Sequence, residues 1–365
     1  MTTPENVDLL VVGSGVVGLA HAARAHAEGL SVAIVDREHA VTGASVRNFG
    51  HVCVTSQAGE LLDMARVSRE RWIAVGEAAG FRVDRCGTVV VARTATELAV
   101  LEDFCALRGP EAVRMLTADG VREATGLDSV GGAHLPVDLR VDPREAAPAL
   151  ARWLGEQPGV ELHFNRSYLG HESEGVARTS RGPIRAARTV VCVGHDLDQL
   201  HPDVAAAHEI TRCRLHMALV RMPVTIGHPV LSGTSMLRYD AYAGLPSLGA
   251  LAEELAATCP ELLDVDANLM ATQRPGGTLL VGDSHERSLD CPPFLPESTS
   301  TTLLDAAGRL LGGTPEVLER WQGVYASSPR GPYLRQEVAP GVTAVSVTTG
   351  VGMTIAHGLA ATTEY

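Results

Sequence analysis

The sequence is poor in aromatic side chains, in positive charge and in long apolar stretches. Aromatic residues account for 4% of the 365 residues, and 30 basic residues face 43 acidic ones, which gives a net charge of −13. An acidic chain without a lysine- or arginine-rich run is a poor candidate for general nucleic-acid binding. The apolar segment 9–17 is interrupted by Gly13 and Gly15 and is too short to span a bilayer, and residues 1–8 lack a basic region. We therefore expect a soluble, cytoplasmic protein that binds neither nucleic acid nor a membrane.

Cysteines are also few, and they are scattered. None of the seven forms a CxxC pair, so the sequence does not support a redox dithiol or a zinc ribbon, and an odd, dispersed set suits a reducing compartment. The densest group of potential metal ligands is Asp283, His285 and Glu286, but neighbouring residues on a strand point to opposite faces. We therefore predict no metal site.

What the chain has in abundance is apolar and small residues. Hydrophobic residues make up 45% of the sequence and charged residues 20%, which is typical of a globular protein. With 37 glycines and 20 prolines, many tight turns are expected. A length of 365 residues favours about two domains.

The N-terminal segment has the pattern of a nucleotide-binding fold. The apolar run 9–12 is typical of a strand buried on both faces of a parallel sheet. It leads into the glycine-rich segment GSGVVG at 13–18, a helix-favouring stretch at 19–28, and a second strand at 31–35 that ends in Asp36. Strand, glycine turn, helix, strand and acid therefore follow one another in the order of a dinucleotide-binding unit.

Each part of this unit has a physical role. Gly13 permits a tight turn, Gly15 lets the backbone approach a pyrophosphate, and Gly18 lets the helix pack closely on the strand. The helix N-terminus attracts phosphate, and Asp36 is able to accept hydrogen bonds from ribose hydroxyls. We therefore predict a bound dinucleotide; a glycine turn in an unrelated α/β protein is the alternative.

Four later features favour FAD over NAD. The loop 42–51 (TGASVRNFGH) is small, polar and bounded by glycine, as suits a segment that wraps a pyrophosphate and a flavin edge. Residues 160–172 contain a mid-chain strand pair, and 189–194 (TVVCVG) is a buried strand that ends in glycine. Near the end of the chain, a strand at 343–347 runs into the glycine turn and helix of 348–356 (TTGVGMTIA).

In this order the motifs resemble those of the D-amino-acid oxidase/glycine oxidase superfamily of FAD-dependent oxidoreductases. The resemblance runs from residue 8 to about residue 358 and rests on GSGVVG with its terminal acid, the TGAS…N.GH loop, VVCVG and GVGMT. The segments GASVRNFGHV, SSPRGPYL and TTGVGMT further resemble a subgroup linked to aminophosphonate breakdown. The resemblance implies FAD, and because no cysteine occupies an obvious attachment position we expect it to be bound non-covalently.

The resemblance also implies an α/β fold of two interleaved domains. A Rossmann-like FAD-binding domain would take residues 1–80, 140–210 and 320–365. A glycine oxidase-like α+β substrate domain with a mixed sheet would take 81–139 and 211–319.

Local patterns agree with this division. The expected strands are an antiparallel pair within 81–94 that turns near Cys86 and Gly87, a strand at 212–222, and a hairpin at 271–281. The expected helices are 58–79, ended by Gly80, and 143–154, with Asp142 as N-cap and Pro143 as first residue. Residues 224–260 are broken by glycine and proline and show no long periodicity.

The motifs and the resemblance together predict the residues that contact FAD. These are Gly13, Ser14, Gly15, Val16, Val17, Gly18, Asp36, Arg37, Ala44, Ser45, Arg47, Asn48, Gly50, His51, Tyr168, Gly194, Arg330, Gly350, Gly352, Met353 and Thr354.

The substrate's anionic end needs a partner that the family's pattern does not supply here. In the amino-acid oxidases an arginine shortly after a Trp-x-Gly segment holds the carboxylate, whereas in this sequence the matching residue of segment 321–325 is Tyr325. Shortly afterwards, Ser328 and Arg330 offer a hydroxyl and a guanidinium that suit a tetrahedral oxyanion. We predict this clamp; a surface turn with a solvated arginine is the alternative.

Three further side chains are candidates for contact with the substrate. His51 follows the glycine of the flavin loop and is a candidate substrate contact or weak base, with a structural histidine as the alternative. Tyr239 and Tyr242 lie in the segment that forms the cavity wall or lid in the family, and each is otherwise a packing residue.

The sequence therefore predicts FAD-dependent oxidation of a small primary or secondary amine that carries an anionic group. Hydride passes to flavin N5, the imine is hydrolysed to an aldehyde or keto product, and O2 or another acceptor reoxidises the flavin. An aminophosphonate is the favoured substrate, and glycine, sarcosine or a D-amino acid is the alternative. A nicotinamide-dependent dehydrogenase, and a flavoprotein without amine turnover such as an RNA-modification module or a scaffold, are more remote alternatives. The oligomeric state stays open.

Overall fold

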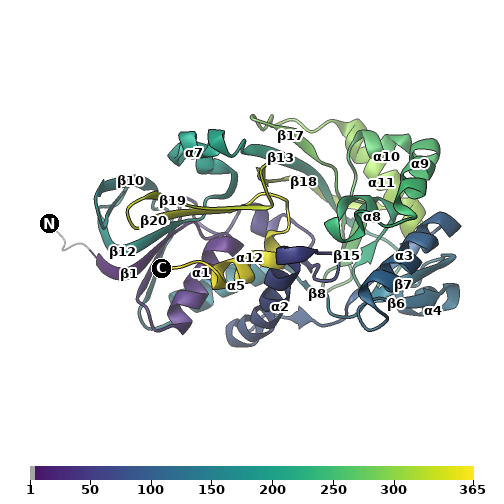
Figure 1. Ribbon diagram of the computed structural model, residues 1–365, viewed down its shortest axis with the longest axis horizontal. Coiled ribbons are helices and arrows are strands. Elements are labelled where there is room, and N and C mark those ends of the chain that lie inside the picture. Colours follow the sequence, from purple (N-terminus) through teal and green to yellow (C-terminus); the bar gives the residue numbers. More distant parts are fainter. Residues whose placement is uncertain (1–4) are drawn as a thin grey trace.

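The computed structural model describes residues 5–365 and contains two large β-sheets that lie side by side along the long axis of the molecule (Figure 1). The first sheet and its helices form the left half of the view, and the second sheet with a separate set of helices forms the right half. Strands of the first sheet come from three separate stretches of the chain, residues 5–35, 160–191 and 333–347.

The first sheet has eight strands around a parallel centre. β1 pairs in parallel with β12 on one side and β2 on the other, and β9 and β20 extend the parallel pairing outwards. Leu9, Leu10 and Val11 are fully buried because both faces of β1 are covered, as the apolar run predicts. The strands are β1 (Glu5–Val12), β2 (Val32–Val35), β9 (Val160–His163), β10 (Tyr168–Ser173), β11 (Val176–Thr179), β12 (Ile184–Val191), β19 (Tyr333–Ala339) and β20 (Val342–Val347).

Four helices pack on one face of this sheet: α1 (Val16–Ala27), α2 (Gly59–Ala79), α5 (Pro143–Gly155) and α12 (Gly352–Ala361) (Figure 1). As predicted, α2 ends at Gly80 with left-handed backbone, and the Asp142 side chain caps α5 by accepting a hydrogen bond from the Arg144 amide. Trp72 of α2 is fully buried and donates from Nε1 to the Met353 carbonyl at 2.7 Å, which ties α2 to α12.

The second sheet has nine strands and is mixed, because β14 pairs in parallel with β5 while the other pairs are antiparallel. The hairpin predicted at 271–281 is present as β15 and β16. The strands are β5 (Thr88–Ala92), β6 (Arg114–Thr117), β7 (Gly131–Leu135), β13 (Thr211–Arg221), β14 (Val230–Leu231), β15 (Met270–Gln273), β16 (Leu279–Gly282), β17 (Glu286–Ser288) and β18 (Glu316–Ser327).

Helices and short connecting elements complete the molecule. The helices near the second sheet are α3 (Ala95–Arg108), α4 (Ala118–Thr125), α8 (Gly233–Arg238), α9 (Leu248–Thr258), α10 (Pro260–Asp264) and α11 (Glu297–Leu311). A three-stranded sheet contains β3 (His51–Val52), β8 (Leu139–Val141) and β4 (Val83–Asp84). The remaining short elements are η1 (Ala44–Val46), η2 (Gly194–Asp196), α6 (Leu197–Leu200), α7 (Pro202–Ala207) and η3 (Asp240–Tyr242).

Two predicted strand pairings are wrong. β4 and β5 do not form a hairpin, because β4 pairs with β8 in the small sheet while β5 pairs with β7 and β14 in the second sheet. The strands β9 and β10, predicted as a pair within residues 160–172, are not partners either. β9 pairs with β2, and β10 pairs with β11. Alternating apolar residues identify a strand, but its partner depends on where distant segments lie.

The segment 224–260, which shows no long periodicity in the sequence, contains β14, α8, η3 and α9. One further prediction, the domain boundary at residue 320, needs correction. The predicted boundary at residue 320 divides β18, yet β18 pairs with β13 from Glu316 to Ser327 and so belongs entirely to the second sheet.

Within the described residues, no helix combines the length and the apolar character that a membrane span needs.

Candidate functional site

A cavity of about 770 Å³ lies between the two sheets and is lined by residues from both. From the first sheet come the first glycine turn, the loop after β2, the ends of β12 and β20, and the last glycine turn. The other half of the molecule contributes residues of β13 and β18 in the second sheet, residues of α8, and the segment that follows β16. The cavity therefore joins most of the motifs that the sequence analysis singled out.

The first glycine turn is shaped by close backbone packing. Gly13 has a φ of +103°, and a Cβ there would lie 2.4 Å from the Cys192 carbonyl oxygen. A Cβ on Gly18 would lie 2.0 Å from the Gly13 carbonyl oxygen, so neither position accepts a side chain. Gly15 is the N-cap of α1 and provides no capping side chain, which leaves the helix N-terminus facing the cavity.

The loop after β2 is tied to this helix. The amide of Val16 in the first turn of α1 donates to Ser45 Oγ at 2.8 Å. Asn48 donates from Nδ2 to the Ala44 carbonyl and accepts from the Gly50 amide at 2.7 Å, so its side chain holds the shape of the loop. A side chain at Gly50, whose φ is +68°, would meet the Val141 carbonyl oxygen at 1.9 Å.

Asp36, at the end of β2, is held rigidly at the cavity. Its Oδ2 accepts from the Ser14 amide at 2.7 Å and from Ser14 Oγ at 2.6 Å, while Oδ1 accepts from the Glu38 amide at 2.9 Å. The carboxylate therefore joins the first glycine turn to the end of β2 and lies where an adjacent hydroxyl group would find an acceptor.

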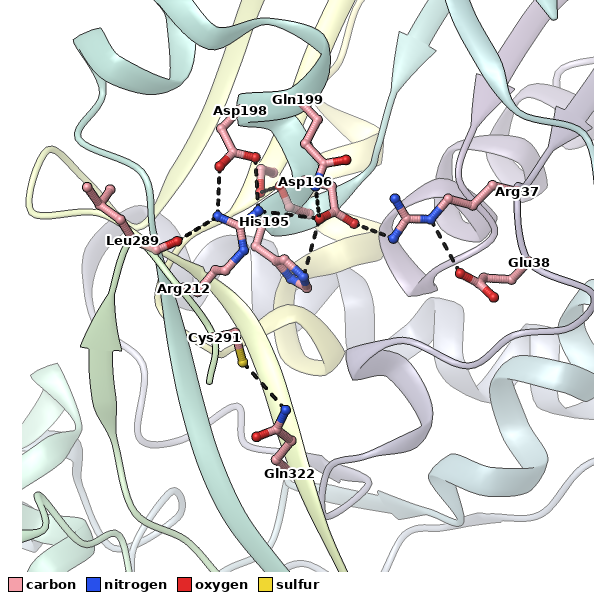
Figure 2. A network of polar contacts seen from close by, with 12 residues as sticks. Arg37, Glu38, His195, Asp196, Asp198, Gln199, Arg212, Leu289, Cys291 and Gln322 are labelled. Carbon is pink, nitrogen blue, oxygen red and sulfur yellow. Dashed lines mark hydrogen bonds and ion pairs between the residues drawn. The ribbon is translucent and has the colours of Figure 1, made fainter. Parts of the chain in front are cut away.

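An ion-pair network extends from Arg37 and Asp196 in the cavity wall to Arg212 (Figure 2). Asp196 in η2 accepts from Arg37 at 2.6 Å through one carboxylate oxygen and from Arg212 at 3.5 Å through the other. Arg212, at the start of β13, also pairs with Asp198 at 2.7 and 3.0 Å. Because Arg37 follows a strand of the first sheet and Arg212 belongs to the second, the network connects the two halves of the molecule.

The last glycine turn lies beside the first one. A Cβ on Gly352, the first residue of α12, would lie 3.8 Å from Val16 Cγ1 of α1. Gly350 has a φ of +78°, and a Cβ there would lie 2.9 Å from Cζ of Tyr325. Val351 at the N-cap of α12 provides no capping hydrogen bond, so two helix N-termini meet at the cavity.

His51 lies in a buried cluster at the cavity wall. Its Nε2 contacts Thr88 Oγ1 at 2.6 Å and Asp138 Oδ2 at 3.4 Å. Oδ1 of Asp138 accepts from both the amide and the hydroxyl of Thr55. His51, Cys53 and Asp138 place their potential ligand atoms within 4.8 Å of one another. Their spacing in the sequence does not predict this group. Thr55 and Thr88 hold Asp138 and His51 in place, whereas His51 Nδ1 and Asp138 Oδ2 have no hydrogen-bond partner among the described residues.

The cavity wall formed by α8, β18 and the segment after β16 is polar. Arg238 at the end of α8 donates to the Tyr325 hydroxyl at 3.1 Å and approaches Asp266 at 3.4 Å. Tyr239 also lines the cavity, and burial raises the pKa of both Tyr239 and Tyr325 above the usual value, so both remain protonated donors.

Two more ionisable groups complete this wall. Burial raises the pKa of Asp283 to about 7 and lowers that of His285 to about 3. His285 donates from Nδ1 to the Asp266 carbonyl at 2.8 Å and is neutral near pH 7.

The sequence of this chain matches a known protein family over almost its whole length. A family model described as FAD dependent oxidoreductase matches residues 8–365. The chain belongs to this family of FAD-dependent oxidoreductases.

One curated relative, gamma-glutamylputrescine oxidoreductase from Escherichia coli (strain K12), is 26% identical over 226 residues. That match covers 54% of this chain and 51% of the relative, so it spans about half the relative's length.

Solved structures share the fold over nearly the whole chain. Glycine oxidase from Geobacillus kaustophilus has a TM-score of 0.77 at 20% identity, covering 98% of this chain and 94% of that one. L-proline dehydrogenase from P. horikoshii has a TM-score of 0.78 at 16% identity, covering 98% and 92%. Iminodiacetate oxidase from Chelativorans sp. BNC1 has a TM-score of 0.75 at 19% identity, covering 97% and 93%. The predicted glycine oxidase-like α/β fold is thus confirmed.

The residues present fit FAD. The glycines of the turn at Gly13 and Gly15 and the N-terminus of α1, where Gly15 provides no capping side chain, form a cradle for a pyrophosphate. The Asp36 carboxylate is placed to accept hydrogen bonds from ribose hydroxyls. The N-terminus of α12, which has no side-chain cap, provides positive potential for an electron-rich ring edge.

Most of the residues predicted to contact FAD line the cavity. These are Gly13, Ser14, Gly15, Val16, Val17, Asp36, Arg37, Ala44, Ser45, Arg47, Asn48, His51, Tyr168, Gly194, Gly350, Gly352, Met353 and Thr354. Gly18 and Gly50 are not in its wall, because each is needed for close backbone packing.

The predicted clamp of Ser328 and Arg330 is wrong. Arg330 is exposed and pairs with Glu209, and Ser328 Oγ donates to the His208 carbonyl, so both lie on the surface outside the cavity. The same correction applies to Arg330 as a contact of FAD. Its turn follows the end of β18, beyond the part of the strand that faces the cavity.

Tyr242 is also outside the cavity wall. It is fully buried and packs on Phe104 with ring centroids 4.3 Å apart, which makes it a core residue. Sequence reasoning missed the place of Asp283 and His285, which it considered only as metal ligands. The available signal was a charged pair directly after the buried apolar strand β16.

Proposed function

We propose that this protein oxidises a small primary or secondary amine that carries an anionic group at its other end. The observation that carries the proposal is the position of Arg238, which lines the cavity and donates to Tyr325, whose ring lies beside Gly350 of the last glycine turn. Its guanidinium is oriented by Tyr325 and Asp266, so an anion that enters the cavity meets a fixed cation. FAD, when bound, supplies the acceptor for the hydride that leaves the carbon next to the amine nitrogen.

The chain's own residues bind and orient the substrate. Arg238 holds the anionic group, and the hydroxyls of Tyr239 and Tyr325 are protonated donors on the same wall. A fixed anion sets the position of the carbon that gives up hydride. His51, fixed by Thr88 and Asp138, adds a second polar side chain near the loop after β2.

The names of similar proteins support an amine substrate. Glycine oxidase, L-proline dehydrogenase, iminodiacetate oxidase and gamma-glutamylputrescine oxidoreductase are all named for nitrogen-containing substrates. Each of these likenesses is distant, and the curated one covers only half of that protein.

Within this class, we favour an aminophosphonate over an α-amino acid. A phosphonate has three oxygens in a tetrahedral arrangement, and the wall offers three separate donor side chains: Arg238, Tyr239 and Tyr325. A planar carboxylate would be better matched by a second arginine at position 325, where this chain has tyrosine. Glycine, sarcosine and D-amino acids are the alternative substrates.

Anaerobic mixing tests the proposal. The FAD-loaded protein is mixed with 2-aminoethylphosphonate, N-methylated 2-aminoethylphosphonate, glycine, sarcosine or D-alanine, and the visible absorbance band of the flavin is followed. Bleaching by an aminophosphonate supports the full proposal, and bleaching only by the carboxylates supports the alternative. If none of these amines bleaches the flavin, the proposal fails and a flavoprotein without amine turnover is favoured. Air is then readmitted with and without an artificial dye, which separates an oxidase from a dehydrogenase.

A further inference from the structure

Asp283 occupies a rigid position at the cavity wall. It follows directly after β16 and is 5% exposed, with its side chain at the cavity. Its amide donates to the Asn268 carbonyl at 3.0 Å, and its carbonyl accepts from the Asn268 amide at 2.9 Å. The backbone of the second sheet therefore fixes where the carboxylate lies.

One oxygen of this carboxylate lacks a hydrogen-bond donor among the described residues. In the part of the chain that the structure describes, Asp283 Oδ1 is buried without a hydrogen-bond partner. The nearest basic group to Oδ2 is Nε2 of His285 at 3.9 Å, which is beyond hydrogen-bonding distance. Because His285 already donates from Nδ1 to the Asp266 carbonyl, its neutral ring has no N–H left for Asp283.

No arginine forms an ion pair with Asp283 in the part of the chain that the structure describes. The charged and titratable groups around Asp283 are Arg238 and Tyr239 of the α8 segment, Cys213 of β13, Tyr325 of β18, Asp266 before β15, and His285. Arg238 attracts the Asp283 carboxylate and so opposes the rise of its pKa, but its ion-pair partner is Asp266, which also pairs with Arg287 at 2.8 Å. A buried carboxylate with an unpartnered oxygen and no ion pair is unfavourable, and a ligand cation would relieve this cost.

We infer that Asp283 binds the substrate's ammonium group and accepts one of its protons; this inference rests on the proposed amine oxidation. One N–H bond of the ammonium breaks, its electron pair stays on nitrogen, and the proton forms an O–H bond on the Asp283 carboxylate. The resulting neutral amine is the form able to release hydride from the adjacent carbon, and the proton leaves to solvent after the product departs. Burial raises the pKa of Asp283 to about 7, so the carboxylate is a base suited to near-neutral pH.

The arrangement also defines the substrate class more closely. Arg238 and Asp283 lie on the same cavity wall and are not paired with each other. A small zwitterion whose cation and anion are separated by a short chain would satisfy both, whereas a simple alkylamine would leave Arg238 without an anion.

The test compares an amine with its amine-free analogue in wild-type protein and in Asp283→Asn. Anaerobic flavin reduction gives the apparent Kd for 2-aminoethylphosphonate, and the shift of the flavin spectrum gives the Kd for ethylphosphonate. At pH 7.5 we expect the variant to weaken amine binding roughly 10- to 100-fold, because a charged hydrogen bond is lost, and to change ethylphosphonate binding less than about 3-fold. If glycine proves to be the reductant, glycine and acetate replace this pair. Asp290→Asn, an exposed aspartate outside the cavity, is the matched control and should match the wild type.

The outcomes separate the two proposals. If no amine reduces the wild-type flavin, the proposed function itself fails. If an amine reduces the wild type and binds Asp283→Asn equally well, or if the amine and ethylphosphonate lose affinity equally, Asp283 is only structural and the inference is overturned.

The pH dependence provides a second readout that does not need the variant to fold. In the wild type, the ratio of the Kd for the amine to the Kd for ethylphosphonate should rise as pH falls below about 7, because a protonated Asp283 no longer attracts the ammonium. Titration of the phosphonate largely cancels in this ratio. Asp283→Glu should keep this dependence and Asp283→Asn should lose it; a ratio that stays flat in the wild type would overturn the inference.

Discussion

Replacing Asp283 by asparagine should stabilise the protein above pH 7 even though it impairs amine binding. The wild-type carboxyl has a pKa of about 7 in the folded protein, against 3.8 for an unperturbed aspartate, because it is buried. Between pH 4 and pH 7 the unfolded chain therefore releases this proton while the folded chain retains it. The free energy of unfolding falls through this range and the loss is complete above the folded pKa.

The pKa difference sets an upper limit on the effect. A shift from 3.8 to about 7 corresponds to a loss of about 4 kcal/mol at 1.36 kcal/mol for each pH unit. Asp283 borders a cavity that admits water, which reduces the cost of the charge, so we expect asparagine to recover roughly 1–3 kcal/mol at pH 8. At pH 4 the two proteins should be about equally stable.

Thermal unfolding of the FAD-loaded proteins at pH 4.5, 6, 7 and 8 tests this. The variant's Tm should exceed that of the wild type by a few degrees at pH 8, with the difference growing from pH 4.5 to pH 7 and then levelling off. Buried histidines such as His21, whose pKa burial lowers to about 4, also make stability depend on pH, but they contribute equally to both proteins. A difference that is the same at every pH, or a variant that is less stable at pH 8, would refute the reasoning.

Further predictions address the cofactor and the cavity walls. Gly13→Ala should abolish retention of FAD, measured as the flavin-to-protein absorbance ratio after gel filtration, because the new Cβ would lie 2.4 Å from the Cys192 carbonyl oxygen. Arg238→Gln should raise the apparent Kd of the anionic amine at least roughly 10-fold in anaerobic flavin reduction, since a buried charged contact is lost, whereas Arg330→Ala should change it by less than about 2-fold. Equal effects of these two substitutions would contradict the placement of the anion site. Tyr242→Phe should leave the rate of flavin reduction within about 3-fold of wild type, because its ring is in the core; a much larger loss would assign its hydroxyl to the site.

The cofactor half of the site was predictable because its requirements are local. A turn that needs left-handed backbone at Gly13, an acid at the end of the next strand, and a glycine turn before the last helix are all visible as short motifs. These motifs identified the segments that meet at the cavity, and the cavity wall includes most of the residues assigned to FAD.

The substrate half was predicted less well because its residues have no common motif. Arg330 looked suitable in sequence, with hydroxyls beside a guanidinium, but its turn ends on the surface next to Glu209. Tyr239 and Tyr242 lie three residues apart on one short segment, yet the first lines the cavity and the second packs on Phe104. The direction of each side chain depends on how the segment rests on the second sheet.

The sequence alone predicted the buried strands, the helix ends at Gly80 and Asp142, the glycine turns and the class of cofactor. These features were predictable because glycine conformation, helix capping and apolar periodicity act within a few residues of the chain. Strand partners, the bridge from Arg37 through Asp196 to Arg212, and the shared wall of Arg238 and Asp283 arise only when segments far apart in the chain fold together. Such contacts carry no local signature, since charge pairing and burial depend on distance in space and not on distance along the chain.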